Sequence, residues 1–116
     1  MKFKLTFNAA DFQKFKLVLS PAEYDTLMDV MIFVTLQDPP AGIKDKIVLC
    51  LVQSFYVRLQ SKALIKQRAY NFTIPIAEAM AFQAFWSGKP ARDIISSNVV
   101  NTIIGEVDRK TKSITF

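Results

Sequence analysis

A proline-rich loop between two helical segments is the feature that most constrains how this chain can fold. Residues 38–42 read Asp-Pro-Pro-Ala-Gly; the two prolines prevent a helix from continuing, and the glycine permits a turn. Upstream, residues 20–23 read Ser-Pro-Ala-Glu, a capping box with proline at the first helical position. These signals predict one helix over about 21–37 and a second, longer one over about 43–67. Because the connection is short, the two helices should lie antiparallel as an αα-hairpin.

Three short segments alternate apolar and polar residues with a period of two, which is typical of a strand with one buried face. They are residues 2–7, 69–74 and 112–116. We therefore expect a small sheet of two or three short strands.

Residues 8–19 admit two interpretations. In the favoured one, Asn8 caps a short N-terminal helix with an apolar face. In the other, residues 14–19 form a strand in a hairpin with the first strand, since the Lys-Phe-Lys-Leu of residues 2–5 recurs there. Both interpretations stay open at the level of sequence.

Two further helices are predicted in the C-terminal half. One opens at Pro75 and ends at Gly88, and the other begins near Pro90, where apolar residues recur with a spacing near four. The aromatic side chains of the first share a face that we expect to lie in the core: Phe82, Phe85 and Trp86.

These elements combine into a mostly helical α+β fold. Its centre is the αα-hairpin, joined by two further helices, a short N-terminal helix and the small sheet. A chain of 116 residues that is 51% hydrophobic buries roughly two-thirds of its unfolded surface, which suffices for one core. No linker divides the sequence, so we expect a single globular domain over residues 1–116.

The residue types that most often carry catalysis are scarce. The chain has no histidine, one cysteine and three scattered glycines, which excludes His-dependent nucleophiles, Cys-based zinc sites and glycine-rich phosphate loops. Asp25 and Asp29 share a helix face, but nothing completes a metal site there. Cys50 lies in an apolar run, 47–52, and is predicted to be buried. We expect a protein that is not an enzyme and uses no metal and no cofactor.

The sequence also carries expectations about location. The longest apolar run, residues 47–59, is too short for a membrane helix, which needs about 20 residues, and it contains Arg58. Charged residues from Asp11 onward interrupt any signal-peptide core. We expect an intracellular protein with no membrane partner, of a size that suits an accessory protein of a virus or mobile element.

Surplus apolar side chains near the proline loop predict a protein-interaction surface. The 21–37 helix becomes apolar all round toward its end, and the next helix contains six consecutive apolar residues at 47–52. A domain of this size can surround one such helix, but hardly two at the same end. The strand at 2–7 and the aromatic helix would cover this surplus, or a second protein chain would. The candidate interface residues are Ile32, Phe33, Leu36, Pro39, Pro40 and Ile47.

The leading hypothesis is therefore a non-enzymatic interaction or assembly module. It would associate with itself, as a homo-oligomer, or with another protein through the apolar surface near residues 38–42.

The alternative hypothesis is a nucleic-acid-binding accessory protein. The chain has fifteen Lys and Arg against ten Asp and Glu, a net charge of +5. Basic residues recur every four positions in the second half of the 43–67 helix, so they would share one face and could lie along a phosphate backbone. The candidate residues are Arg58, Lys62, Lys66 and Arg68, with Arg109, Lys110 and Lys112 as further cations. The competing interpretation is that these cations stabilise a helix C-terminus.

Overall fold

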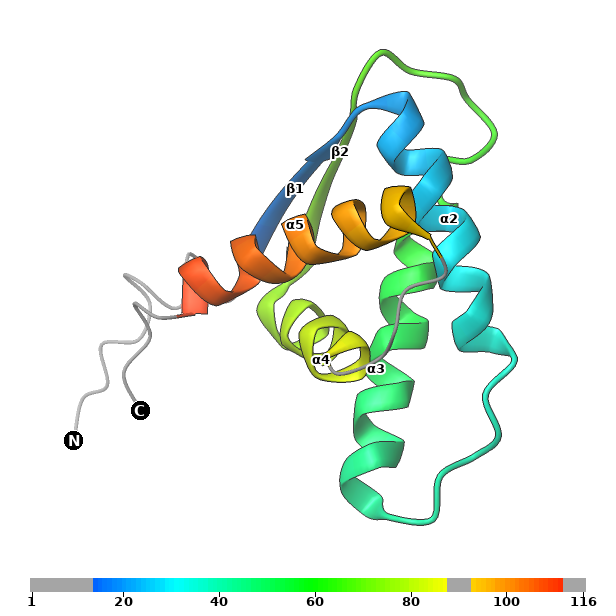
Figure 1. Cartoon of the computed structure of the whole chain (residues 1–116), viewed down its shortest axis with the longest axis vertical. Helices are drawn as coiled ribbons and strands as arrows, with labels where there is room; N and C mark the ends of the chain where they lie inside the picture. The colour runs from blue at the N-terminus through cyan, green and yellow to red at the C-terminus, as the bar shows by residue number, and fades with distance from the viewer. Residues whose placement is uncertain (1–13, 88–92, 112–116) are drawn as a thin grey trace, which may run out of the picture.

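The computed structural model describes residues 14–87 and 93–111. Within these ranges it is a mostly helical α+β fold with a two-stranded antiparallel sheet. In chain order the elements are β1 (Lys14–Leu19), α2 (Pro21–Thr35), α3 (Ile43–Gln60), β2 (Tyr70–Pro75), α4 (Ile76–Trp86) and α5 (Ile94–Thr111). Figure 1 shows α5 crossing the two strands, and α2 descending to a loop from which α3 rises, so the predicted αα-hairpin is confirmed.

The segment 14–19 is a strand, so the favoured helix is wrong for this part of the chain. Strict alternation puts Phe15, Leu17 and Leu19 on one face, where all three are buried, whereas a helix would turn Leu17 away from the other two. The described partner of β1 is β2, with Phe15 opposite Ile74. The strands predicted at 2–7 and 112–116, and the hairpin with the first of them, lie outside the described residues.

The capping box predicted at residues 20–23 opens α2. The Ser20 hydroxyl accepts a hydrogen bond from the Glu23 amide at 3.2 Å, and the Glu23 carboxylate accepts one from the Ser20 amide at 2.8 Å. Two of the amides at the helix start are thereby satisfied. The Asp93 carboxylate caps the start of α5, where it accepts a hydrogen bond from the Ser96 amide at 2.7 Å.

The second helix ends at Gln60, well before the predicted end near residue 67. The Leu59 carbonyl accepts a 2.6 Å hydrogen bond from the Tyr24 hydroxyl. The Ala63 amide bonds the carbonyl of Gln60, three residues back, instead of that of Leu59. The Lys62 amide likewise bonds the Leu59 carbonyl, three residues back, so the backbone has passed from α-helical to tighter single turns at this point.

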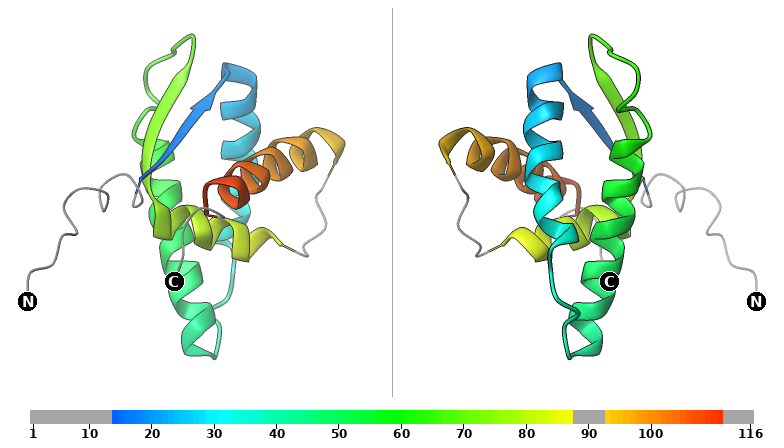
Figure 2. Two further views of the ribbon diagram at one scale, coloured as in Figure 1. Left: turned by 90° about the vertical axis from the view of Figure 1, so that its left-hand side faces the viewer. Right: turned by 90° about the vertical axis from the view of Figure 1, so that its right-hand side faces the viewer.

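One core joins the six elements. Figure 2 shows the strands and α3 on one side and α5 on the other, with α2 and α4 between them. The aromatic face predicted on α4 is buried, and its Phe82 packs edge-on against Phe55 of α3 at 5.2 Å between ring centroids. The largest fully buried side chains are Phe55, Phe82, Leu27, Met31, Leu59 and Ile74.

Tyr24 links three of these elements. Its ring stacks on Tyr70 of β2 at 4.0 Å, and its hydroxyl bonds the end of α3. Burial, and to a lesser extent the neighbouring Tyr70, raises the pKa of the Tyr24 hydroxyl above its ordinary value of 10.0.

We predict that Tyr24→Phe lowers the free energy of unfolding by about 1 kcal/mol, because the ring stays while one hydrogen bond is lost. Urea unfolding monitored by circular dichroism measures this change. Because the folded-state pKa exceeds the unfolded one, the contribution of Tyr24 is fully present below about pH 10 and is lost as the pH rises further. The difference between wild type and Tyr24→Phe should therefore shrink above pH 10. A difference that grows with pH would contradict this assignment.

Candidate protein-interaction surface

The solvent face of α3 carries a row of apolar side chains. Ile43, Ile47, Cys50 and Val57 recur at helical spacing, so they fall on one side of the helix. Ile43 is 71%, Ile47 53% and Val57 63% exposed, and Cys50 is exposed as well. We call these four residues the α3 stripe.

The α3 stripe lies opposite the face that holds the helix in the fold. Val52, Phe55 and Leu59 are fully buried on that inner face. At about 100° per residue, the stripe is centred roughly half a turn away from this inner row. Helix α3 is therefore apolar on two opposite faces, of which the described fold covers only one.

Cys50 was predicted to be buried, and that prediction is wrong. Six consecutive apolar residues, 47–52, cannot all face the core from one helix, and the register turns Val52 inward and Cys50 outward. A continuous apolar run does not reveal which of its members will be exposed.

The loop that precedes α3 adds to this surface. Leu36, just beyond the end of α2, is 70% exposed, and Ile32, Phe33 and Pro39 are exposed too. The loop and the first turns of α3 extend away from the rest of the molecule (Figures 1 and 2). Of the six candidate interface residues, five are exposed and Pro40 is half-buried.

The described elements cover this end only in part. Phe33 contacts Trp86 of α4, with ring centroids 6.0 Å apart. Between the loop and the end of α4 a pocket of about 310 Å³ remains, lined by Gln37, Asp38, Pro40, Asp45, Val48, Leu49, Ala84 and Phe85. Val48 and Leu49 are consequently only half-buried. Helix α4 therefore shields Phe33 in part, and most of the other apolar side chains near the loop remain exposed to water.

The basic residues do not form the predicted stripe. Because α3 ends at Gln60, only Arg58 lies on the helix, and Lys62, Lys66 and Arg68 follow in the connection to β2. Lys66 and Arg68 are exposed there. The prediction of one continuous basic helix face is therefore wrong.

Two of these cations are engaged within the fold. The Arg58 guanidinium forms a 2.8 Å ion pair with Glu78, a carboxylate that is only 4% exposed on α4. The Ser54 hydroxyl donates a second hydrogen bond to Glu78 at 2.9 Å. Lys62 donates to the Asn71 carbonyl, and its ammonium lies 5.1 Å from the centre of the Phe72 ring.

Glu78 is the structural residue that sequence reasoning underestimated. It lies in the first turn of α4, where the helix dipole favours a carboxylate. Its larger role is to hold α4 against α3 through Arg58 and Ser54. The sequence feature that points to this role is that Glu78 is the one charged residue in the mostly apolar segment 75–87.

The structure does not assemble a metal site from the described acidic residues. Asp25 and Asp29 are exposed on α2. In the ranges 14–87 and 93–111, no three potential ligands among Asp, Glu and Cys gather into a group that could hold a metal ion. None of the helices in the described part of the chain has both the length and the apolarity to cross a bilayer.

Comparisons with protein-family models, with curated proteins and with solved structures found no match to this chain.

We predict that Arg58→Met lowers the free energy of unfolding by about 2 kcal/mol, because it leaves the Glu78 carboxylate buried without its counter-charge. Lys66→Met, on an exposed cation a few residues away, should change it by less than about 0.5 kcal/mol. The double change Arg58→Met with Glu78→Gln should recover part of the loss, since no unpaired charge then remains. Equal effects of Arg58→Met and Lys66→Met in urea unfolding would show that the ion pair is unimportant.

Proposed function

We propose that this protein is a non-enzymatic assembly module that self-associates through the α3 stripe and the adjoining loop end. The observation that supports the proposal is the exposure of Ile43, Ile47 and Val57 on the face of α3 opposite the core. Removing apolar surface from water is favourable by roughly 25 cal/mol per Å². Large contiguous apolar patches on soluble proteins commonly mark contact surfaces.

The spacing of the α3 stripe suits a second helix. Residues 43, 47, 50, 54 and 57 follow one another at intervals of four and three, which is the repeat of a helix–helix seam. Position 54 is occupied by Ser54, which is half-buried and donates to Glu78, so α4 borders the seam at this point. The partner that best matches such a seam is the same seam on a second copy, because an isologous interface needs only one surface.

An antiparallel pair of α3 helices suits the charges. Lys44 and Lys46 both lie near the start of α3, so a parallel pair would set the lysines of the two copies against each other. In an antiparallel pair centred on Cys50 they lie at opposite ends. The helix dipoles also favour this arrangement. Leu36 and the loop then flank the seam and extend the contact.

Nucleic-acid binding through the basic residues has weaker support. Arg58 is exposed but pairs with Glu78, and Lys62 donates to the Asn71 backbone carbonyl. Lys66 and Arg68 are the two exposed cations of the set that make neither contact. Two phosphate contacts would supply only a small share of the affinity typical of such proteins.

We predict that the chain is at least a dimer at micromolar concentration and that Ile47→Glu shifts association at least tenfold toward monomer. A carboxylate in the middle of an apolar contact would have to be desolvated without a partner. Sedimentation equilibrium at several concentrations, in low and high salt, measures the mass. High salt should leave apolar association intact.

The matched control is Ile94→Glu, which makes the same substitution at an isoleucine that is 78% exposed in the first turn of α5. It should leave the association constant unchanged, and circular dichroism should show both variants folded. A strictly monomeric wild type at about 100 μM would contradict the proposal. So would equal effects of the two substitutions.

A further inference from the structure

A second surface, independent of the α3 stripe, lies along the edge of β1 that no other described strand pairs with. Among the described residues β1 pairs with β2 alone, on one of its two sides. In an antiparallel ladder every second residue directs its N–H and C=O away from the paired neighbour. The outer edge of β1 is therefore a template for a further strand.

This edge forms one wall of a groove whose other wall is α5. Val99, Thr102, Ile103 and Glu106 fall on one side of α5 and line a space of about 280 Å³ together with residues 15–19 of β1. The Glu23 carboxylate lines the same space, so the basic character of the groove is confined to its other end. The space continues past the start of β1 into a wider one of about 610 Å³. The groove thus runs the length of the strand, which is the geometry needed to lay an extended chain beside it.

The floor of the groove is apolar. Phe15, Leu17 and Ile103 are buried there, and Val99 is half-buried. An added strand would place alternate side chains over this floor and the others on the outer face of the sheet, beside Lys14 and Lys16.

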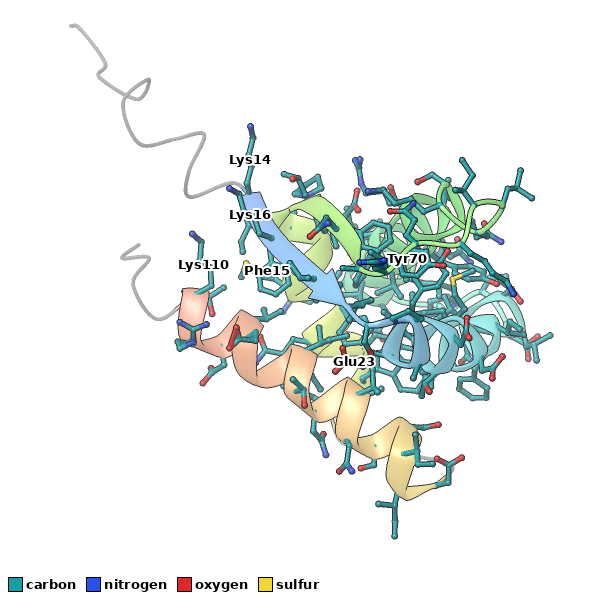
Figure 3. The ribbon with its side chains drawn as sticks, turned by 90° about the horizontal axis from the view of Figure 1, so that it is seen from above. Lys14, Phe15, Lys16, Glu23, Tyr70 and Lys110 are labelled. Atoms are coloured by element: carbon teal, nitrogen blue, oxygen red, sulfur yellow. The ribbon has the colours of Figure 1, made fainter. Side chains whose placement is uncertain are left out.

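The wide end of the groove is basic. Among the described residues, its lining includes Lys14, Lys16, Arg109 and Lys110 and one carboxylate, Glu106. Arg109 pairs with Glu106 at 2.5 Å, whereas neither Lys14 nor Lys16 forms an ion pair within the described residues. Figure 3 shows Lys14, Lys16 and Lys110 projecting from neighbouring ends of β1 and α5.

We propose that this groove binds an extended segment of another protein in which apolar and acidic residues alternate. The segment would add a strand to β1, with its apolar side chains over the floor and its carboxylates beside Lys14 and Lys16. Opposite charges on neighbouring strands stabilise their pairing, and like charges oppose it.

The same charges disfavour occupants from this chain. A second copy of β1 would bring Lys14 and Lys16 close to their own equivalents. Residues 2–7 carry Lys2 and Lys4 in the same alternation, so they would set further lysines beside these two. An acidic strand has neither drawback.

The test uses the full chain and a fluorescent peptide of alternating Glu and Val, eight residues long, in an anisotropy titration at physiological salt. We expect saturable binding in the micromolar range and at least tenfold weaker binding of the matching Lys–Val peptide. Methylating every second backbone nitrogen of the Glu–Val peptide blocks one of its two edges. One of the two methylated versions should lose at least tenfold in affinity, and the other should not.

The variant Lys14→Glu/Lys16→Glu should weaken Glu–Val binding at least tenfold and strengthen Lys–Val binding. The matched control, Lys44→Glu/Lys46→Glu on α3, should change neither. Equal binding of both methylated peptides would show that the peptide is held by charge attraction and not by backbone pairing with β1, and it would overturn the proposal. The absence of any Glu–Val binding at about 1 mM would overturn it too. So would a single-stranded oligonucleotide that binds more tightly than the peptide and depends on Lys14 and Lys16.

Discussion

The fold depends on the burial of one face of α3. Val52, Phe55 and Leu59 are fully buried on that face, where Phe82 meets Phe55 and Tyr24 bonds the last turn. Burying three large apolar side chains contributes roughly 1.5–3 kcal/mol each. A small domain has few helices and strands with which to surround a helix. In the described part of this chain, these elements all lie on one side of α3. The apolar residues on its other side are left in water by the same packing that stabilises the core.

This packing of α3 against α4 also determines which charged residues must pair with each other. Helix α4 is almost entirely apolar, and its single carboxylate, Glu78, is carried into the contact between the two helices. A buried carboxylate requires partners, and Arg58 and Ser54 supply them from α3. Arg58 is therefore held in an ion pair, although its side chain remains 45% exposed. The basic residues expected on one helix face make different contacts instead of forming one surface. Cations that lie near one another in sequence need not form one binding surface.

Local signals in the sequence predict much of the fold. The capping box at residues 20–23, the prolines at 39 and 40 and the alternation at 70–74 act within a few residues, and each forms the expected element. The errors arise where a distant contact decides. Residues 14–19 become a strand because β2 offers a partner, and α3 ends at Gln60, beside the Leu59 carbonyl that Tyr24 bonds. The composition near the loop predicts more apolar side chains than the core can bury. The exposure of Cys50 and Val57, however, depends on the register of α3, which the composition does not give.

We propose that the outer face of α3 is covered by the same face of a second copy. Spin labels attached at Cys50 report the distance between copies directly, by pulsed electron resonance. An antiparallel pair centred on Cys50 should give a single short distance between the two labels. Labels at Lys44→Cys, in a Cys50→Ser background, should lie farther apart, since they are separated by about 18 Å along antiparallel helices. A signal with no defined distance at Cys50, at concentrations up to about 100 μM, would rule out this pairing of the α3 faces.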